Sequence, residues 1–462
     1  MKNSDVSFPQ VSFDAWKTQV EKELKGAAFN DVLVKQKEGI SVQPLYTDRV
    51  ERVLNEDADE DEIWEEQAGT MRWNSCETYH YNSNDNAFDR IAKAYNDQIA
   101  CLEVFGDIKS FLKSLEGTLP VPVSLLLRAD SFPANDDEVQ EWRTCILGVK
   151  AYHPFIRSLT FDPLSSMLIS GKDELTEQVA ESISNLQIKL IPHLNDSHLI
   201  GVDSSCVGEG GGSSALQLAY ALSAANTYIS QLRRGGLELF EIAHLFSFKF
   251  SIQTDFYLEI AKLKAFSVLW RNLLEAWDES FDYFEDPNIF AVTSRVQFAQ
   301  GDKHNNLLRA TTSAMSAVLG GADTICIAPY QTPSDEHSNR MAQNIHHLLR
   351  YESYLDLHAS AAEGTYFIEH LISELATEAW KLFKELEGQG GSLKSIRTGF
   401  IQKKVAEMKN DVLEQYRNEK RILVGVNKYA MNQEIKFDNS IGNEGEFPAI
   451  PPFNIEQALK QN

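Results

Sequence analysis

Residues 301–329 read GDKHNNLLRATTSAMSAVLGGADTICIAP and contain one complete unit of the fold. A polar loop leads into a helix expected over 306–318, a Gly-Gly turn ends that helix, and an apolar strand follows over 324–328. The side chain of Asn305 or Asn306 is expected to cap the helix. The stretch therefore predicts a helix-then-strand unit of an α/β protein.

The same signals recur along most of the chain. Short apolar runs predict strands over 101–105, 121–127, 145–149, 199–202, 290–293 and 324–328. Helix-like stretches between them cover 87–100, 108–115, 174–186, 215–231, 258–277 and 306–318. Strands that are apolar on both faces and are separated by helices are typical of a parallel sheet covered on both sides. Six such units favour a TIM (β/α)8 barrel over an open sheet.

Both ends of the chain add segments to this barrel. Residues 13–27 predict an amphipathic helix, and VLVKQKEGISVQPLYT at 32–47 alternates like a strand interrupted by a Glu-Gly turn. After the barrel, helices are expected over 368–387 and 400–421, and a strand over 421–430. We expect three parts in all. They are a partner-contacting helix and arm (1–62), the barrel (63–385), and C-terminal helices with an extended tail (386–462).

Composition excludes several classes of protein. The net charge of -24 repels nucleic-acid phosphates and anionic membrane surfaces, and the acidic run Glu56–Glu62 is expected to be a solvated loop. The five cysteines include no CxxC pair, which argues against a zinc site and a disulfide framework. No signal-peptide pattern or membrane-length apolar stretch occurs. We therefore expect a cytoplasmic protein that binds neither nucleic acid nor membrane, and no metal.

The segment Val207–Ser214, VGEGGGSS, joins a strand to a helix and has two interpretations. Its glycines and free helix N–H groups can cradle an anion such as phosphate. It can also be a tight turn in which Ser213 or Ser214 caps the helix. The dinucleotide fingerprint GxGxxG is excluded, because Ser213 stands where its last glycine is needed.

The polar loop before the 306–318 helix contains a further candidate. His304 could act as an acid or base near neutral pH, and Asp302 suits the positive end of the helix dipole. No carboxylate or nucleophile accompanies His304 in a recognisable pattern, so capping is the preferred interpretation. The residues alone predict an α/β barrel without an evident catalytic group.

Longer stretches identify a family. NNLLRATTSAMSAVLGGADTI (305–325), NIHHLLRYESYLDLHASAAEGTYFIEHLISELATEAWKLFKELEGQGG (344–391) and ILVGVNKY (422–429) strongly resemble the methylmalonyl-CoA mutase family. KEGISVQPLYT (37–47) resembles the N-terminal arm of that family, and FPQVSFDAWKTQVEKELKG (8–26) resembles the start of its small subunit. The resemblance covers nearly the whole chain in the correct order.

The resemblance implies a fold and a chemistry. In this family a large subunit interconverts methylmalonyl-CoA and succinyl-CoA by a radical route that starts from adenosylcobalamin. The substrate threads the hollow axis of a TIM barrel, and a flavodoxin-like domain with a DxHxxG motif supplies the histidine that binds cobalt. Some bacteria pair this large (alpha) subunit with a related, inactive small (beta) subunit.

Departures from the family pattern decide the expected role of this chain. No DxHxxG motif occurs in the sequence, so we expect no cobalamin-binding flavodoxin-like domain. The RxYAGF motif aligns with Met71–Cys76, which leaves Trp73 in a degenerate position without the tyrosine, and GYHMQEAG aligns with Ser204–Gly211, which puts Cys206 in the position of the histidine. AQDPYNN aligns with Gln300–Asn306, which breaks the usual Gln-Asp pairing.

The sequence leads to one preferred hypothesis and two alternatives. The preferred one is a non-catalytic small subunit that assembles with a large subunit carrying adenosylcobalamin and binds none itself. The alternatives are a catalytic barrel served by a separate cobalamin-binding protein, and a regulatory barrel that binds CoA thioesters. Residual CoA or substrate binding is expected, if it persists, at Gly210, Ser213, Asp302, His304, Asn306 and Arg309.

Overall fold

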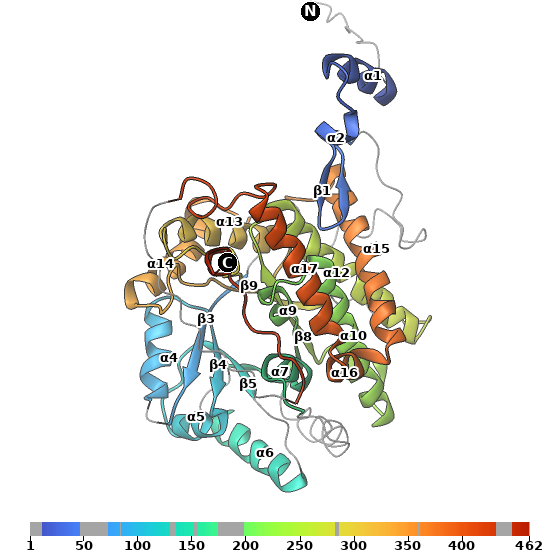
Figure 1. Ribbon diagram of the computed structural model, residues 1–462. Coiled ribbons are helices and arrows are strands. Elements are labelled where there is room, and N and C mark those ends of the chain that lie inside the picture. The colour runs from blue at the N-terminus through green and yellow to red at the C-terminus, as the bar shows by residue number, and fades with distance from the viewer. Residues whose placement is uncertain are drawn as a thin grey trace, which may run out of the picture.

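A closed barrel of eight parallel strands forms the body of the molecule in the computed structural model (Figure 1). The structure describes residues 12–46, 73–83, 85–129, 135–150, 155–173, 198–281, 286–357, 361–430 and 446–461. The barrel order is β10-β3-β4-β5-β6-β7-β8-β9, so the last strand pairs with the first. The strands are β3 Asn74–Tyr81, β4 Cys101–Gly106, β5 Ser124–Ala129, β6 Ile156–Phe161, β7 His198–Asp203, β8 Phe246–Ile252, β9 Asn288–Thr293 and β10 Thr324–Cys326.

Helices surround this barrel and follow most of its strands. A longer outer helix, α15, packs against α10 and α12. The helices that accompany the barrel strands are α4 Ala87–Asn96, α5 Ile108–Leu115, α6 Asp136–Lys150, α7 Pro163–Ser170, α9 Ser205–Glu209, α10 Ser214–Arg234, α11 Leu239–Ala243, α12 Phe256–Trp277, α13 Asn305–Leu319 and α14 Glu336–His347. They are followed by the π-helical turn η2 Leu348–Glu352, α15 Tyr366–Gly388, α16 Gly391–Arg397, α17 Phe400–Arg417 and α18 Ile455–Lys460.

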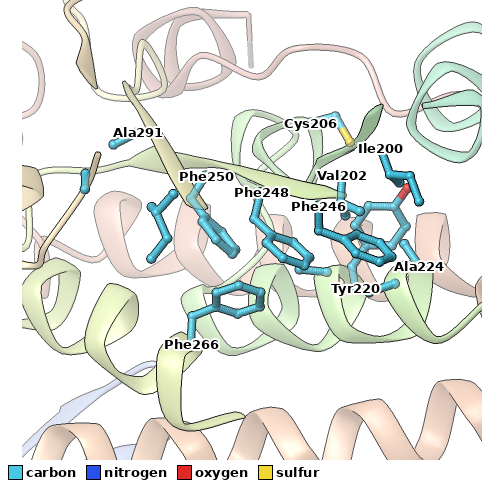
Figure 2. Packing of buried hydrophobic residues seen from close by; sticks show 14 of the residues in the cluster. Ile200, Val202, Cys206, Tyr220, Ala224, Phe246, Phe248, Phe250, Phe266 and Ala291 are labelled. Carbon is cyan, nitrogen blue, oxygen red and sulfur yellow. The ribbon is translucent and has the colours of Figure 1, made fainter. Parts of the chain in front are cut away.

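The layer between strands and helices is apolar, and β8 shows why. Its sequence FSFKFSI alternates, so Phe246, Phe248 and Phe250 all point outward toward the helices (Figure 2). Phe248 and Phe250 lie 4.6 and 4.8 Å, between ring centroids, from Phe266 on α12. Burying one such side chain stabilises the fold by about 1.5–3 kcal/mol. The same alternation directs Lys249 to the inside of the barrel.

The N-terminal arm stands apart from the barrel. Helix α1 Phe13–Glu23 and helix α2 Phe29–Leu33 lie away from the body, and the hairpin β1 Lys35–Lys37 and β2 Ile40–Val42 connects them to it (Figure 1). The hairpin turn contains Glu38 and Gly39, both with positive φ, as the Glu-Gly signal predicts. Among the described residues, no helix is long and apolar enough to cross a membrane.

The structure confirms the predicted barrel and corrects several elements. The apolar run 145–149 is not a strand but part of helix α6, and 421–430 forms a loop with one isolated bridge. Strands β3, β6 and β8 were absent from the prediction. The helix expected over 174–186 and the acidic run Glu56–Glu62 lie outside the described residues.

Candidate functional site

Charged side chains occupy the axis of the barrel. Glu103 on β4 and Lys249 on β8 face each other across the interior, and the lysine Nζ lies 2.6 and 2.9 Å from the two carboxylate oxygens. The same Nζ lies 4.7 Å from the ring centroid of Phe290 on β9. Burial alone would lower the pKa of Lys249, but the carboxylates of Glu103 and Asp203 outweigh it and raise the pKa. The lysine is therefore a charged, paired group that spans the axis.

A second ion pair lies nearer the carboxyl ends of the strands. Arg128 on β5 donates to the carboxylate of Asp203 at the end of β7. Burial would raise the pKa of Asp203, yet the charges of Arg128 and Lys249 lower it overall. Asp162, after β6, accepts from the backbone N–H of Asp203 at 2.7 Å and from the hydroxyl of Tyr228 at 3.0 Å. This network fixes the carboxylates in place, and burial raises the pKa of Asp162 while that of Asp203 is lowered.

Three thiols on neighbouring strands also line the axis. Cys326, Cys76 and Cys101 are register partners on β10, β3 and β4, and they cluster with Phe290. Burial raises the pKa of Cys101 to about 11 and that of Cys326 to about 12. These groups remain protonated thiols at neutral pH and are poor nucleophiles and metal ligands. Among the described residues, no three His, Cys, Asp or Glu side chains are placed to hold a metal ion.

The space left inside the barrel is small. A cavity of about 120 Å³ extends from the first residues of the strands, such as Asn74 and His198, to Asp203. Sites for small organic molecules and cofactors usually measure about 300–1,000 Å³. The cavity can hold a few water-sized groups, but not the long chain of an acyl-CoA.

The carboxyl-end mouth of the barrel is covered by the C-terminal segment, residues 447–460. Its backbone N–H groups at Ile450, Phe453 and Ile455 donate to carbonyls of Leu168, Glu209 and Val296 at 2.7, 2.7 and 3.0 Å. Those carbonyls lie after β6, β7 and β9, so the segment crosses the ends of all three strands. Figure 1 shows it running from beside α7 to the chain end near α13. In a TIM barrel this is the face on which active sites are built.

The arm presents a different surface. Helix α1 has no buried residue and packs only on α2 among the elements with substantial contacts. Phe13, Trp16 and Phe29 form a chain of aromatic rings with centroids 5.4 and 5.9 Å apart. The hairpin anchors the arm, because the carboxylate of Glu38 accepts from the backbone N–H of Ser214 at 2.7 Å and Lys37 pairs with Asp255 at 2.6 Å.

Comparison with known proteins identifies the family. The family model described as methylmalonyl-CoA mutase matches residues 165–444, which is more than half of the chain. The chain belongs to the methylmalonyl-CoA mutase family. This agrees with the resemblance of the sequence and with the barrel of the structure.

The relatives carry the names methylmalonyl-CoA mutase and methylmalonyl-CoA mutase small subunit. A protein named methylmalonyl-CoA mutase small subunit from Porphyromonas gingivalis is 25% identical, and the alignment covers 98% of this chain and 76% of that protein. Methylmalonyl-CoA mutase of Rhizobium meliloti is 28% identical over 57% of this chain and 37% of its own length. A methylmalonyl-CoA mutase small subunit from Streptomyces virginiae is 26% identical, and the alignment covers 66% of this chain and 48% of that protein. This chain thus spans about three quarters of the first relative and less than half of the other two.

Cys206 and Trp73, the two positions expected to align with catalytic residues of the family, lie beyond opposite ends of the barrel strands. Cys206 is on α9, after the carboxyl end of β7, and its Sγ donates to the carbonyl of Asp203 at 3.1 Å. Burial raises the pKa of Cys206 well above its ordinary value. Trp73 precedes the amino end of β3, where its indole N–H donates to Nδ1 of His346 at 3.1 Å. The structure does not bring these two residues into one site.

The glycine-rich turn is filled by the chain itself. A Cβ on Gly210 would lie 2.1 Å from Cγ2 of Ile450, so this glycine is needed for the C-terminal segment to pack. Ser213 caps α10 by accepting from the backbone N–H of Leu216 at 3.2 Å, as one interpretation of the sequence predicts. The anion that meets the start of α10 is the carboxylate of Glu38 from the arm.

Side chains at the start of α13 form hydrogen bonds to neighbouring loops. Asn306 donates to the carbonyls of Ala299 and Tyr330, both at 2.9 Å, and Arg309 donates to the carbonyl of Val424 at 2.6 Å. The capping prediction is wrong here, because His304 is the N-cap residue and makes no side-chain capping bond. Asn305 lies inside the helix and donates to the carboxylate of Asp302 at 2.6 Å. These side chains join α13 to neighbouring loops and do not converge on a ligand cavity.

The family implies adenosylcobalamin, and the described residues do not fit it. A corrinoid is much larger than the 120 Å³ inside the barrel, and the segment 447–460 covers the mouth. The family's cobalt-binding histidine belongs to a DxHxxG motif, which this sequence does not contain. No step of a radical reaction is therefore derived for this chain.

Sequence reasoning missed the four charged residues that fill the axis, namely Glu103, Lys249, Arg128 and Asp203. A signal for them exists, because each stands at an alternating position in a strand, as in LEVFG and FSFKFSI. A period of two with charges on one face indicates a polar barrel interior.

Proposed function

We propose that this chain is the non-catalytic small (beta) subunit of a heterodimeric methylmalonyl-CoA mutase. In this proposal a separate large (alpha) subunit binds adenosylcobalamin and interconverts methylmalonyl-CoA and succinyl-CoA in the cytoplasm. The observation that carries the proposal is the axis of the barrel, which the ion pairs Glu103–Lys249 and Arg128–Asp203 occupy. The names of two of the relatives, both small subunits, support it as well.

The physical basis of the missing activity is the cost of opening the axis. A thioester chain could thread the barrel only if both ion pairs separated and the C-terminal segment left the mouth. Each separated charge would then stay in a poorly solvated interior without a partner, which costs about 3–5 kcal/mol per broken pair. That cost would offset the binding free energy of an ordinary ligand.

The physical basis of assembly is the arm. Its aromatic residues Phe13 and Trp16 stay partly exposed on a helix that the barrel does not cover. A short helix with one apolar face is marginal by itself in water, so a partner surface that buries the face stabilises both. Obligate subunit interfaces bury about 2,000–5,000 Å², and an arm that reaches away from its own barrel increases the area available.

Reconstitution tests this proposal. The purified chain is mixed with the large subunit, and the mass of the product is measured by size-exclusion chromatography with light scattering. We expect a one-to-one complex that has mutase activity, while this chain alone has none. A chain that stays monomeric beside a fully active large subunit would contradict the proposal. Turnover by this chain with adenosylcobalamin and a detached cobalamin-binding protein would favour the catalytic alternative instead.

A further inference from the structure

A groove lies outside the barrel at the seam where the barrel closes. Strands β10 and β3 pair there, and the helices α14 and α4 flank the seam. Helix α14 packs on α13 and helix α4 packs on α5, but between α14 and α4 there is a groove of about 460 Å³. We call it the seam groove. It is lined by Glu77, Arg90, Lys93, Asn96, Asp97, Gln98, Glu336, Asn339, Arg340, Gln343, Asn344 and His347.

The floor of the seam groove is polar where the rest of that layer is apolar. Strand β3 directs Glu77 outward, at a level where β4 and β8 present leucine, valine and phenylalanine. The carboxylate of Glu77 accepts from Nη2 of Arg90 and from the side-chain amide of Gln343. The two charged side chains are only 16% and 22% exposed. Burying an ion pair contributes little to stability compared with an apolar pair of similar volume, so packing does not explain these residues.

Two guanidinium groups in the groove keep donors without acceptors. Nη1 of Arg90 is buried and has no hydrogen-bond partner among the described residues. Arg340 is exposed on α14, and its side chain forms no hydrogen bond or ion pair within the described part of the chain. A buried donor without a partner is destabilising, and a guanidinium fork matches the geometry of a carboxylate or phosphate. The unfilled partner is therefore an oxyanion.

The remaining lining suits a polar ligand of modest size. Amide side chains of Asn96, Asn339 and Asn344 can both donate and accept hydrogen bonds. Lys93 pairs with Glu336 at 3.3 Å, but both are well exposed, so this pair is weak and can exchange partners. The volume lies within the range of small-molecule sites. The groove lining contains three cationic and three carboxylate side chains. It is therefore less acidic than the chain as a whole, whose net charge is -24.

We propose that the seam groove binds a small polar molecule through a carboxylate or phosphate group seated on Arg90 and Arg340. The site is separate from the barrel axis and from the arm, and it goes beyond the proposed subunit role. Its ligand would bind the isolated chain, whatever the outcome of reconstitution with a large subunit.

Thermal unfolding with inorganic phosphate, citrate and chloride at equal ionic strength tests the site. A ligand that binds only the folded chain raises its melting temperature with concentration. We expect phosphate or citrate to raise the melting temperature more than chloride, and the part of the rise that depends on Arg340 separates binding from the general stabilisation by excluded anions. Absence of a rise beyond that of chloride would overturn the proposal.

Variants locate the binding. Arg340→Ala removes an exposed side chain from a helix and should abolish the rise, whereas Arg234→Ala, an exposed arginine at the end of α10, should leave it unchanged. Arg90→Lys keeps a charge beside Glu77 but loses the fork, so it should weaken binding about tenfold without preventing folding. An equal rise in Arg340→Ala and in the unmodified protein would contradict the assigned site.

Discussion

The inside of the barrel and the surface of the arm differ in whether their side chains have partners within the described part of the chain. Inside, Lys249 and Arg128 each have a carboxylate partner, and little space remains between them. On the arm, α1 presents Phe13 and Trp16 without a covering element. The paired charges leave little room inside the barrel, while the uncovered aromatic face of the arm has apolar surface that a partner can bury. Under the proposed function, the role of this chain lies on its outer surface.

The strongest way to break the comparison is to remove one charge from the axis. Lys249→Met leaves Glu103 buried without its partner, and we expect it to lower the free energy of unfolding by about 3–5 kcal/mol in urea denaturation. The double variant Glu103→Leu with Lys249→Met removes both charges and should recover most of that loss. A single variant within about 1 kcal/mol of the unmodified protein would show that the pair does not organise the interior.

The arm gives the next largest effect, measured as partner affinity. Trp16→Ala removes the central ring of the aromatic chain, and buried aromatic residues at the centre of interfaces contribute about 2–4 kcal/mol to binding. We expect a loss of at least about thirtyfold in affinity for the large subunit, by analytical ultracentrifugation. Thr18→Ala, on the exposed face of the same helix, is the matched control. Equal affinity of Trp16→Ala and Thr18→Ala would remove the arm from the interface.

The junction of the two regions gives a smaller effect. Glu38 anchors the hairpin at the start of α10, and hydrogen bonds to charged groups contribute about 1.5–3 kcal/mol. Glu38→Ala should therefore speed hydrogen exchange of the hairpin amides over 35–42, as measured by mass spectrometry, and leave the barrel strands unchanged. Ser41→Ala in the same hairpin serves as the control, since Ser41 bonds only within the hairpin among the described residues. Unchanged exchange in Glu38→Ala would mean that other contacts hold the arm.

The smallest effect depends on pH and belongs to the barrel. Burial lowers the pKa of His346 to about 3 in the folded chain, compared with about 6.5 when it is unfolded. Between about pH 3 and pH 6.5, His346 is therefore protonated in the unfolded chain and neutral in the folded chain. The free energy of unfolding is highest above about pH 6.5 and decreases as the pH falls below that value. We expect His346 to lower the free energy of unfolding by about 1.4 kcal/mol at pH 5.5 relative to pH 8.

Denaturation of two neighbouring variants isolates that contribution. His346→Gln keeps a neutral acceptor for the indole of Trp73 and should have a flatter dependence on pH. His347→Gln removes only a minor contribution to the lowered pKa of His346, after burial and Arg350, and should keep most of the dependence of the unmodified protein. A steep dependence that survives in His346→Gln would assign it to another group.

The sequence allowed the barrel to be predicted where strands are apolar on both faces. β4, β7 and β9 were found because their runs are short, apolar and bounded by turns. β3 and β8 were missed because polar residues interrupt their sequences, as in NSCETYHY and FSFKFSI, and they do not form continuous apolar runs. In the run at 145–149, Cys145, Ile146 and Val149 are buried on helix α6 while Leu147 is exposed, and a short apolar run in the sequence cannot distinguish such a helix from a strand.

The site was harder to predict for a related reason. The assignment of Cys206 and Trp73 to degenerate catalytic positions stays a prediction, and the sequence does not show which charges meet across a closed barrel. Glu103 and Lys249 are separated by 146 residues and become partners only through the curvature of the sheet. The cover formed by residues 447–460 also depends on a tertiary contact, between Gly210 and Ile450.

Calorimetric titration of the purified chain tests the central claim most directly, with succinyl-CoA in one experiment and the large subunit in the other. The account predicts heat and one-to-one saturation with the large subunit, and no heat with the thioester when the Arg340→Ala variant, which lacks the seam-groove site, is titrated. Saturable binding of succinyl-CoA to that variant alone, in the absence of its partner, would contradict it.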